Sequence, residues 1–237
     1  MKYRFPFVPL VACFLAMAYC VSAQAHFVWV ALSASDRTAS LFFGEGPEPS
    51  EADLLDRVAQ AKVFARDSEG KYLPLKLEKK VSGSQGSWIA AEDGNAWKGL
   101  EAVCDYGVLT KRERPFWLKY YAKYLDRSAL KNQVLCQSEK LPLDIIPIPQ
   151  GDGIALQVTM EGKPVEGAEV VITDDAYEQQ KLTTDANGKV LLKDPKPDTY
   201  CVRAKWVEEK PGEHDGKQYE SIRHYSTVAL NLSTDQT

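Results

Sequence analysis

His26 is the residue with the richest chemistry in this sequence, because a predicted cleavage makes it the first residue of the mature chain. A positively charged start and an almost wholly apolar stretch, residues 5–20, precede Ala23-Gln24-Ala25, the small-x-small pattern that signal peptidase cuts. Residues 1–25 are therefore predicted to be a signal peptide. A free α-amino group, with a pKa of about 8, and imidazole Nδ1 of the same residue would then chelate a divalent metal ion.

A second imidazole would turn this chelate into a histidine brace of three nitrogen ligands. His224 and His214 are the other histidines of the chain. His224 lies in the β-branched run 223–230, predicted to be the final strand, so we expect it to complete the brace. Its alternative role is a buried histidine bonded to a carbonyl group. His214 lies between turn signals, which predict a solvated loop residue that could only assist. Nitrogen-rich tetragonal geometry favours copper, with nickel or cobalt as the alternative.

Two residues are candidates for an outer shell around such a metal. Glu45 belongs to an acidic turn after the second predicted strand, where a carboxylate could orient an imidazole or hold an axial water. Tyr225 follows His224 directly. The alternative for Glu45 is a solvated acidic loop, which is the usual setting of a carboxylate.

Charge and hydropathy exclude several classes of partner. The chain has 237 residues and a formal net charge of −4. Removal of the first 25 residues, which hold two basic and no acidic groups, leaves 212 residues with a charge of −6. The acidic balance argues against nucleic acid, which requires a basic face. No later apolar stretch approaches the roughly 20 residues that a membrane span needs. We therefore expect an exported protein, periplasmic or extracellular, without a transmembrane segment.

Three cysteines remain after the predicted cleavage. Cys104 and Cys136 both fall in the first predicted domain and could pair in an oxidising compartment, which would stabilise the fold by about 3–4 kcal/mol. Cys201 would stay free, as a small buried hydrophobic residue within a strand.

Short strand-like runs alternate with turn signals, which predicts a mostly β protein of two β-sandwich domains. The proline-rich run 141–151 resembles a stiff connector, and we place the boundary there. Residues 26–145 would form an N-terminal β domain, and residues 146–237 an immunoglobulin-like or transthyretin-like sandwich. The aromatic run 116–124 is a strand candidate, although two of its lysines also fit a helical spacing.

Several phrases, in order along the mature chain, carry a resemblance to a known family: Ala25-His26-Phe27-Val28-Trp29, Phe42-Phe43-Gly44-Glu45-Gly46-Pro47-Glu48-Pro49, Leu118-Lys119-Tyr120-Tyr121-Ala122-Lys123 and Arg223-His224-Tyr225. The chain resembles the DUF4198 family of exported bacterial proteins, which is related to periplasmic components of nickel and cobalt uptake systems. The resemblance implies a β-sandwich protein tied to transition-metal binding or uptake. Nickel-binding partners of that kind tend to carry a histidine just after the N-terminal residue, whereas here the histidine is itself first, which favours copper.

Four functions stay open at this point. The first is an exported protein that chelates a transition metal through His26 and hands it to a membrane metal transporter. The second is a nickel or cobalt uptake accessory protein. The third is a metal-free structural or adhesive surface module, in which the histidines are ordinary. The fourth is a copper-dependent oxidative enzyme. No serine, cysteine or paired-carboxylate motif supports a hydrolase, and we expect a binding protein rather than an enzyme.

Overall fold

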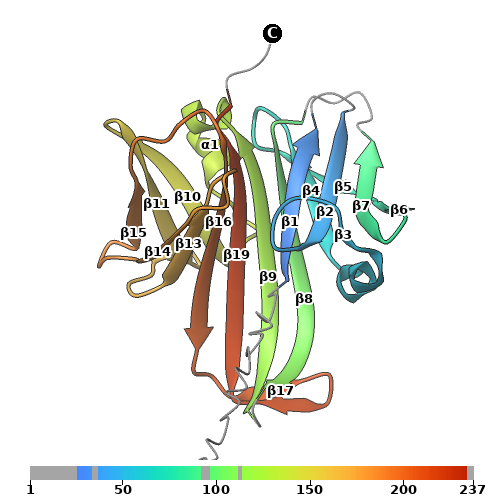
Figure 1. Ribbon diagram of the computed structural model, residues 1–237. Helices are drawn as coiled ribbons and strands as arrows, with labels where there is room; N and C mark the ends of the chain where they lie inside the picture. Colours follow the sequence, from blue (N-terminus) through green and yellow to red (C-terminus); the bar gives the residue numbers. More distant parts are fainter. Residues whose placement is uncertain (1–25, 34–36, 92–96, 112–113, 234–237) are drawn as a thin grey trace, which may run out of the picture.

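Strands dominate the computed structural model, which describes residues 26–33, 37–91, 97–111 and 114–233 (Figure 1). The helical segments of these ranges are short, because the sequence alternates apolar and polar residues with a period of two rather than 3.6. They are η1 (Ala52–Val58), η2 (Ala129–Lys131) and α1 (Gln133–Cys136). The mostly β, sandwich-like architecture predicted from the sequence is confirmed. None of the described helices is long and apolar enough to cross a membrane.

An eight-stranded sheet forms the centre of the molecule and draws strands from both halves of the sequence. β19 and β9 pair in parallel, with Tyr225 opposite Tyr120, and the other pairs of the sheet are antiparallel. In spatial order the strands are β14 (Gln179–Thr183), β13 (Glu169–Thr173), β16 (Thr199–Glu208), β19 (Ser221–Asn231), β9 (Arg114–Asp126), β8 (Gly99–Lys111), β4 (Lys62–Arg66) and β5 (Tyr72–Leu75).

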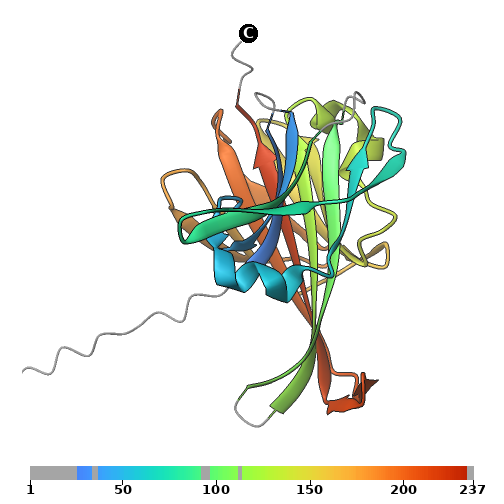
Figure 2. The same cartoon turned by 90° about the vertical axis from the view of Figure 1, so that its right-hand side faces the viewer.

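Two smaller sheets cover opposite faces of this central sheet (Figures 1 and 2). The first packs on the half that contains β8 and β9. A hydrogen bond also joins this sheet to the central one, because the hydroxyl of Thr227 donates to the carbonyl oxygen of Val28 at 2.7 Å. This first sheet consists of β1 (Phe27–Ser33), β2 (Thr38–Gly44), β7 (Gln85–Ala91), β3 (Ser50–Glu51) and β6 (Glu78–Ser82). The second packs on β13, β16 and β19. It consists of β10 (Leu143–Gln150), β11 (Gly153–Met160), β12 (Lys163–Pro164) and β15 (Lys189–Leu192).

Consecutive residues of the central strands therefore enter different cores. Ala229 packs in the core under the first small sheet, whereas Val228 and Leu230 pack in the core under the second. The run 116–124 is a strand, and Phe116, together with every second residue after it, faces the first core, as alternation predicts.

The predicted connector is itself a strand. Residues 143–150 form β10, and the predicted boundary between residues 145 and 146 falls inside it. Pro147 and Pro149 are compatible with a strand here because β10 lies at the edge of its sheet, where a missing N–H disturbs no second neighbour. The two predicted units exist as two packed layers, but they share the central sheet.

Two buried ion pairs fasten the segment around α1 to the central sheet. Lys123 Nζ lies 2.5 Å from Asp144 Oδ1 and donates to the carbonyl oxygen of Cys136 at 2.7 Å. Arg66 Nη1 lies 2.7 Å from Glu101 Oε1 and also donates to the carbonyl oxygen of Gln137. Each of these buried charges therefore lies beside a charge of opposite sign, as burial of a charged group requires.

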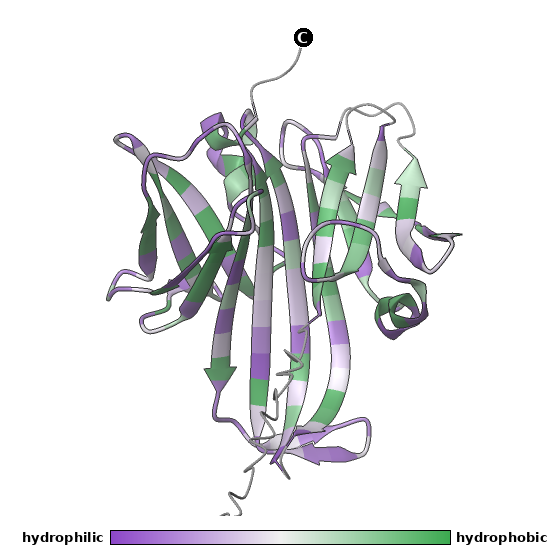
Figure 3. Cartoon of the chain, in the orientation of Figure 1, coloured by the Kyte–Doolittle hydropathy of each residue, from purple (hydrophilic) through white to green (hydrophobic). Residues whose placement is uncertain are grey.

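The longest strands, β8 and β9, run past both small sheets to a hairpin of β17 (Gly212–His214) and β18 (Lys217–Tyr219) (Figure 1). This hairpin is mostly hydrophilic (Figure 3). It is held by the packing of His214 and Tyr219 against Trp117 of β9.

Candidate functional site

His26 lies directly before β1 and is half-buried. Its ring faces Phe43 with the centroids 5.6 Å apart, and its carbonyl oxygen accepts a hydrogen bond of 3.1 Å from the Tyr120 hydroxyl. The side chain lines a shallow cavity of about 210 Å³ together with Phe43, Leu54, Arg57, Tyr106, Leu109, Leu118 and Tyr120. The lining contains no carboxylate, thiol or second imidazole, so His26 alone provides strong metal ligands there.

His224 is buried in β19, with 2% of its surface exposed, and both ring nitrogens have partners. Nδ1 lies 3.1 Å from the Tyr121 hydroxyl oxygen and Nε2 lies 3.4 Å from Glu208 Oε2. Burial lowers the pKa of His224, and the negative charge of Glu208 opposes this effect. The neutral ring is satisfied when the Tyr121 hydroxyl donates to Nδ1 and Nε2–H donates to Glu208. This is the buried structural histidine that the sequence left open as an alternative.

The structure does not bring His26 and His224 together. His26 is bonded to Tyr120, whereas His224 is bonded to Tyr121, and these consecutive residues of β9 point to opposite faces of the central sheet. The residue next to His224, Tyr225, is the one that contacts β1, with its ring 5.2 Å from that of Phe27. The predicted brace between His26 and His224 is therefore not formed, because the side chain of His224 points to the face of the central sheet opposite to that on which His26 lies.

His214 lies in β17 rather than in an open loop. Its ring stacks on Trp117 with centroids 4.2 Å apart, and Nε2 lies 3.6 Å from Asp105 Oδ1 and 3.4 Å from Asp215 Oδ2. Asp105 Oδ1 also accepts a hydrogen bond of 2.6 Å from Trp117 Nε1. The histidine thus belongs to the contacts that hold the hairpin on β9.

The two predicted outer-shell residues have other partners than the imidazoles. Glu45 lines a different region from His26, beside Trp29, Cys201 and Arg203. The ring of Tyr225 packs on Phe27 and Tyr120. Within the described ranges, neither residue has a hydrogen bond to a histidine.

The disulfide that the sequence allowed between Cys104 and Cys136 is not formed in the structure, where both cysteines are free. Cys104 faces the core under the first small sheet, and burial raises its pKa to about 12. Cys136 belongs to α1, near the second core, where its Sγ lies 3.3 Å from the carbonyl oxygen of Ala129. Cys201 is also free, as predicted, and burial raises its pKa to about 12. The spacing along the chain concealed that Cys104 enters the first core whereas Cys136 lies in α1, beside Ala129.

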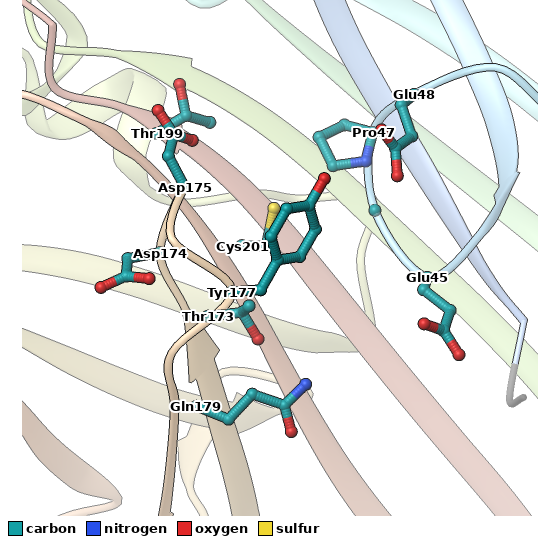
Figure 4. Close-up of a pocket in the computed structure, with 11 residues that line it drawn as sticks. Glu45, Pro47, Glu48, Thr173, Asp174, Asp175, Tyr177, Gln179, Thr199 and Cys201 are labelled. Atoms are coloured by element: carbon teal, nitrogen blue, oxygen red, sulfur yellow. The ribbon is translucent and has the colours of Figure 1, made fainter. Parts of the chain in front are cut away.

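Sequence reasoning missed a groove between the loop that joins β2 to β3 and strands β13, β14 and β16 (Figure 4). Two adjoining cavities of about 320 and 200 Å³ form it, and they share Glu45, Thr173, Gln179 and Cys201. The acidic turn around Glu45 was the only signal in the sequence. The opposite wall comes from residues more than a hundred positions later, which no local pattern connects to that turn.

The fold and these sites define a multi-sheet β-sandwich protein with a histidine directly before its first strand and a groove lined by both charged and apolar groups. Across the described ranges, no group of three or more histidine, cysteine, aspartate or glutamate side chains is placed to hold a metal ion. The chain belongs to the family described as "Domain of unknown function (DUF4198)", whose profile matches residues 23–208.

Two other comparisons add little. None of the curated proteins matches this chain. Among solved structures, it is similar to "Biofilm associated protein - BSP domain", with 13% identity and a TM-score of 0.21. That match covers 88% of this chain but only 30% of the other, and a likeness this distant supports no conclusion about function.

Proposed function

We propose that this protein is exported to the periplasm or the extracellular space, where its processed N-terminus binds a transition metal ion, copper in preference to nickel or cobalt, for transfer to a membrane transporter. The observation that carries the proposal is the position of His26, half-buried directly before β1 with its ring on Phe43. Cleavage before His26 places a free amine and imidazole Nδ1 on one residue. That nitrogen pair suits Cu(II), which leads the affinity order of the divalent ions.

The contacts of His26 favour a carrier over an oxidative enzyme. The hydrogen bond from Tyr120 fixes the backbone of His26 to the central sheet, so the chelating residue is held on a rigid element. His26 supplies only two nitrogens, and the cavity around it adds no strong ligand. The remaining positions on the metal would be filled by exchangeable ligands, which suits release to a partner. Oxygen activation by a brace would need the third nitrogen, and His224 faces the other core.

A metal-free surface module is the second candidate. Its support is that His224 and His214 both have ordinary structural partners, Tyr121 and Trp117. In that case His26 would simply be the residue before β1.

The test is the electron paramagnetic resonance spectrum of one equivalent of Cu(II) bound to the exported protein, after mass spectrometry has established its first residue. The matched variants are an insertion of one alanine before His26, which displaces the amine, and His26→Ala, which removes the imidazole. His214→Ala serves as the control. We expect an axial spectrum with nitrogen couplings in the natural protein and the control, and its loss in both N-terminal variants.

Identical spectra in all four proteins, or weak binding in all of them, would remove the N-terminal chelate and leave the nickel or cobalt uptake accessory protein and the metal-free module as the remaining candidates. Competition between Cu(II), Ni(II) and Co(II) for the same site identifies the preferred metal. Hydrogen peroxide formation with a reductant, above that of free Cu(II), would favour the enzyme instead.

A further inference from the structure

The groove beside the β2–β3 loop carries a different chemistry from His26. Its larger cavity opens between Pro47 and Glu48 on one wall and residues 173–179 on the other (Figure 4). Its smaller cavity adjoins the larger one and is lined by Trp29 of β1 and Arg203 of β16; we call this part of the groove its inner end and the larger cavity its mouth. Because Glu45 lines both cavities, it lies between the mouth and the inner end.

The inner end holds an arginine whose donors are unused. The Arg203 guanidinium lies over the Phe27 ring, with Cζ 4.1 Å from the ring centroid, and is half-buried. In the part of the chain that the structure describes, it has no hydrogen bond or ion pair, although a guanidinium offers five N–H donors. A planar fork of this kind matches a carboxylate, which it can bind through two parallel hydrogen bonds.

The mouth has the opposite charge. Glu45 and Glu48 approach from the β2–β3 loop, and Asp175 approaches from the turn after β13. Asp175 shares a hydrogen bond with Asp198, and this bond, followed by burial, raises the pKa of Asp175 to about 6. At neutral pH the mouth therefore keeps its negative charge and attracts a cation.

An aromatic ring stands across the mouth. Tyr177 is 74% exposed, and its ring points over the opening toward Pro47 and Glu48 (Figure 4). Asp174 fixes its turn, because one carboxylate oxygen accepts hydrogen bonds from the backbone N–H groups of Ala176 and Glu178. An exposed ring in an acidic setting provides a face for an ammonium group.

We propose that this groove binds a small zwitterion of the size of a short peptide. Its carboxylate would pair with Arg203 at the inner end, and its ammonium group would lie among Glu45, Glu48 and the Tyr177 ring at the mouth. The opposite charges of Arg203 and Glu48 would set the orientation in which the ligand binds. Gln179 and Thr173, which line both cavities, supply hydrogen-bonding groups for the peptide unit between the two charges.

The test uses ¹⁵N-labelled processed protein, freed of metal so that binding at His26 cannot contribute. Three probes are titrated: glycylglycine, its N-acetyl form, which lacks the ammonium group, and its amide, which lacks the carboxylate. We expect saturable shifts of the backbone N–H signals that line the groove with glycylglycine, and affinity at least about tenfold lower for each blocked form.

Variants assign the two ends. Arg203→Gln should weaken glycylglycine about tenfold without affecting the amide form, and Glu45→Gln should weaken glycylglycine without affecting the N-acetyl form. Arg203→Lys keeps the charge without the planar fork and should retain part of the affinity, which guards against a variant that fails to fold. Lys205→Gln on the same strand and the exposed Glu166→Gln are the controls. No saturable shift in the groove, or equal losses in Arg203→Gln and Lys205→Gln, would overturn the proposal.

Discussion

Replacement of His224 by alanine separates a structural histidine from a metal ligand. The side chain is almost fully buried, and large-to-small changes at such positions lower the free energy of unfolding by about 2–5 kcal/mol. The change also leaves the Tyr121 hydroxyl without its partner at Nδ1, which costs about 1–3 kcal/mol when the group is buried. Because relaxation offsets part of both effects, we expect a total loss of about 3–5 kcal/mol.

The assay combines urea denaturation with a copper titration against a competing chelator at pH 7. The urea midpoint of His224→Ala should fall, whereas the copper Kd of the folded protein should change by less than about twofold, since His224 faces away from His26. Val228→Ala is the matched control, because Val228 is buried on the same strand and the same face but has no polar atom. It should lower stability and leave the Kd unchanged.

Two results would refute this reasoning. A Kd weakened about tenfold or more in folded His224→Ala, with Val228→Ala unaffected, would make His224 a metal ligand. A stability loss below about 1 kcal/mol would contradict the assigned burial and hydrogen bonding.

Three further predictions concern stability. Burial lowers the pKa of His224 below its ordinary 6.5, so the unfolded chain binds the proton more readily than the folded protein. The contribution of His224 to the free energy of unfolding should therefore be complete above about pH 6.5 and decrease as the pH falls below it. Urea midpoints measured from pH 8 to 5 should vary less in His224→Gln than in the natural protein. Lys123→Met leaves Asp144 buried without its partner and should cost about 3–5 kcal/mol by urea denaturation, whereas the double variant with Asp144→Leu should recover part of that loss; no recovery would contradict the pairing. Gly188→Ala places Cβ 2.6 and 2.9 Å from two backbone atoms at a φ of +71° and should lower the melting temperature more than Gly162→Ala, whose φ of +77° is similar but whose surroundings are open; equal effects would show that the close contacts are unimportant.

The sequence predicted the local structure well where side chains alternate. The strand after His26 and the aromatic run 116–124 both follow the period of two that a half-buried strand imposes. The connector was misjudged because three prolines indicate an extended chain but do not distinguish a free linker from an edge strand.

The candidate site was less predictable, because it depends on which face each strand presents. His224 was correctly placed on a final strand, but only the parallel pairing of β19 with β9 decides that its ring meets Tyr121 and not His26. That pairing joins segments about a hundred residues apart and has no local signal. The same holds for Cys104 and Cys136, and for Arg203 beneath the turn that contains Glu45.

The place of β19 in the sheet also constrains the order of assembly. This last strand lies between β16 and β9, so β9, one of the two longest strands, lacks one of its two neighbours until residues 221–231 are available. A ribosome or a translocation channel that releases the chain from its N-terminus would leave β9 with an open edge from its own release until residues 221–231 follow. Such an edge is a template for wrong pairing. We therefore expect folding to finish only after release of the C-terminal strand, and a chain that stops before residue 221 to aggregate rather than form a stable first half.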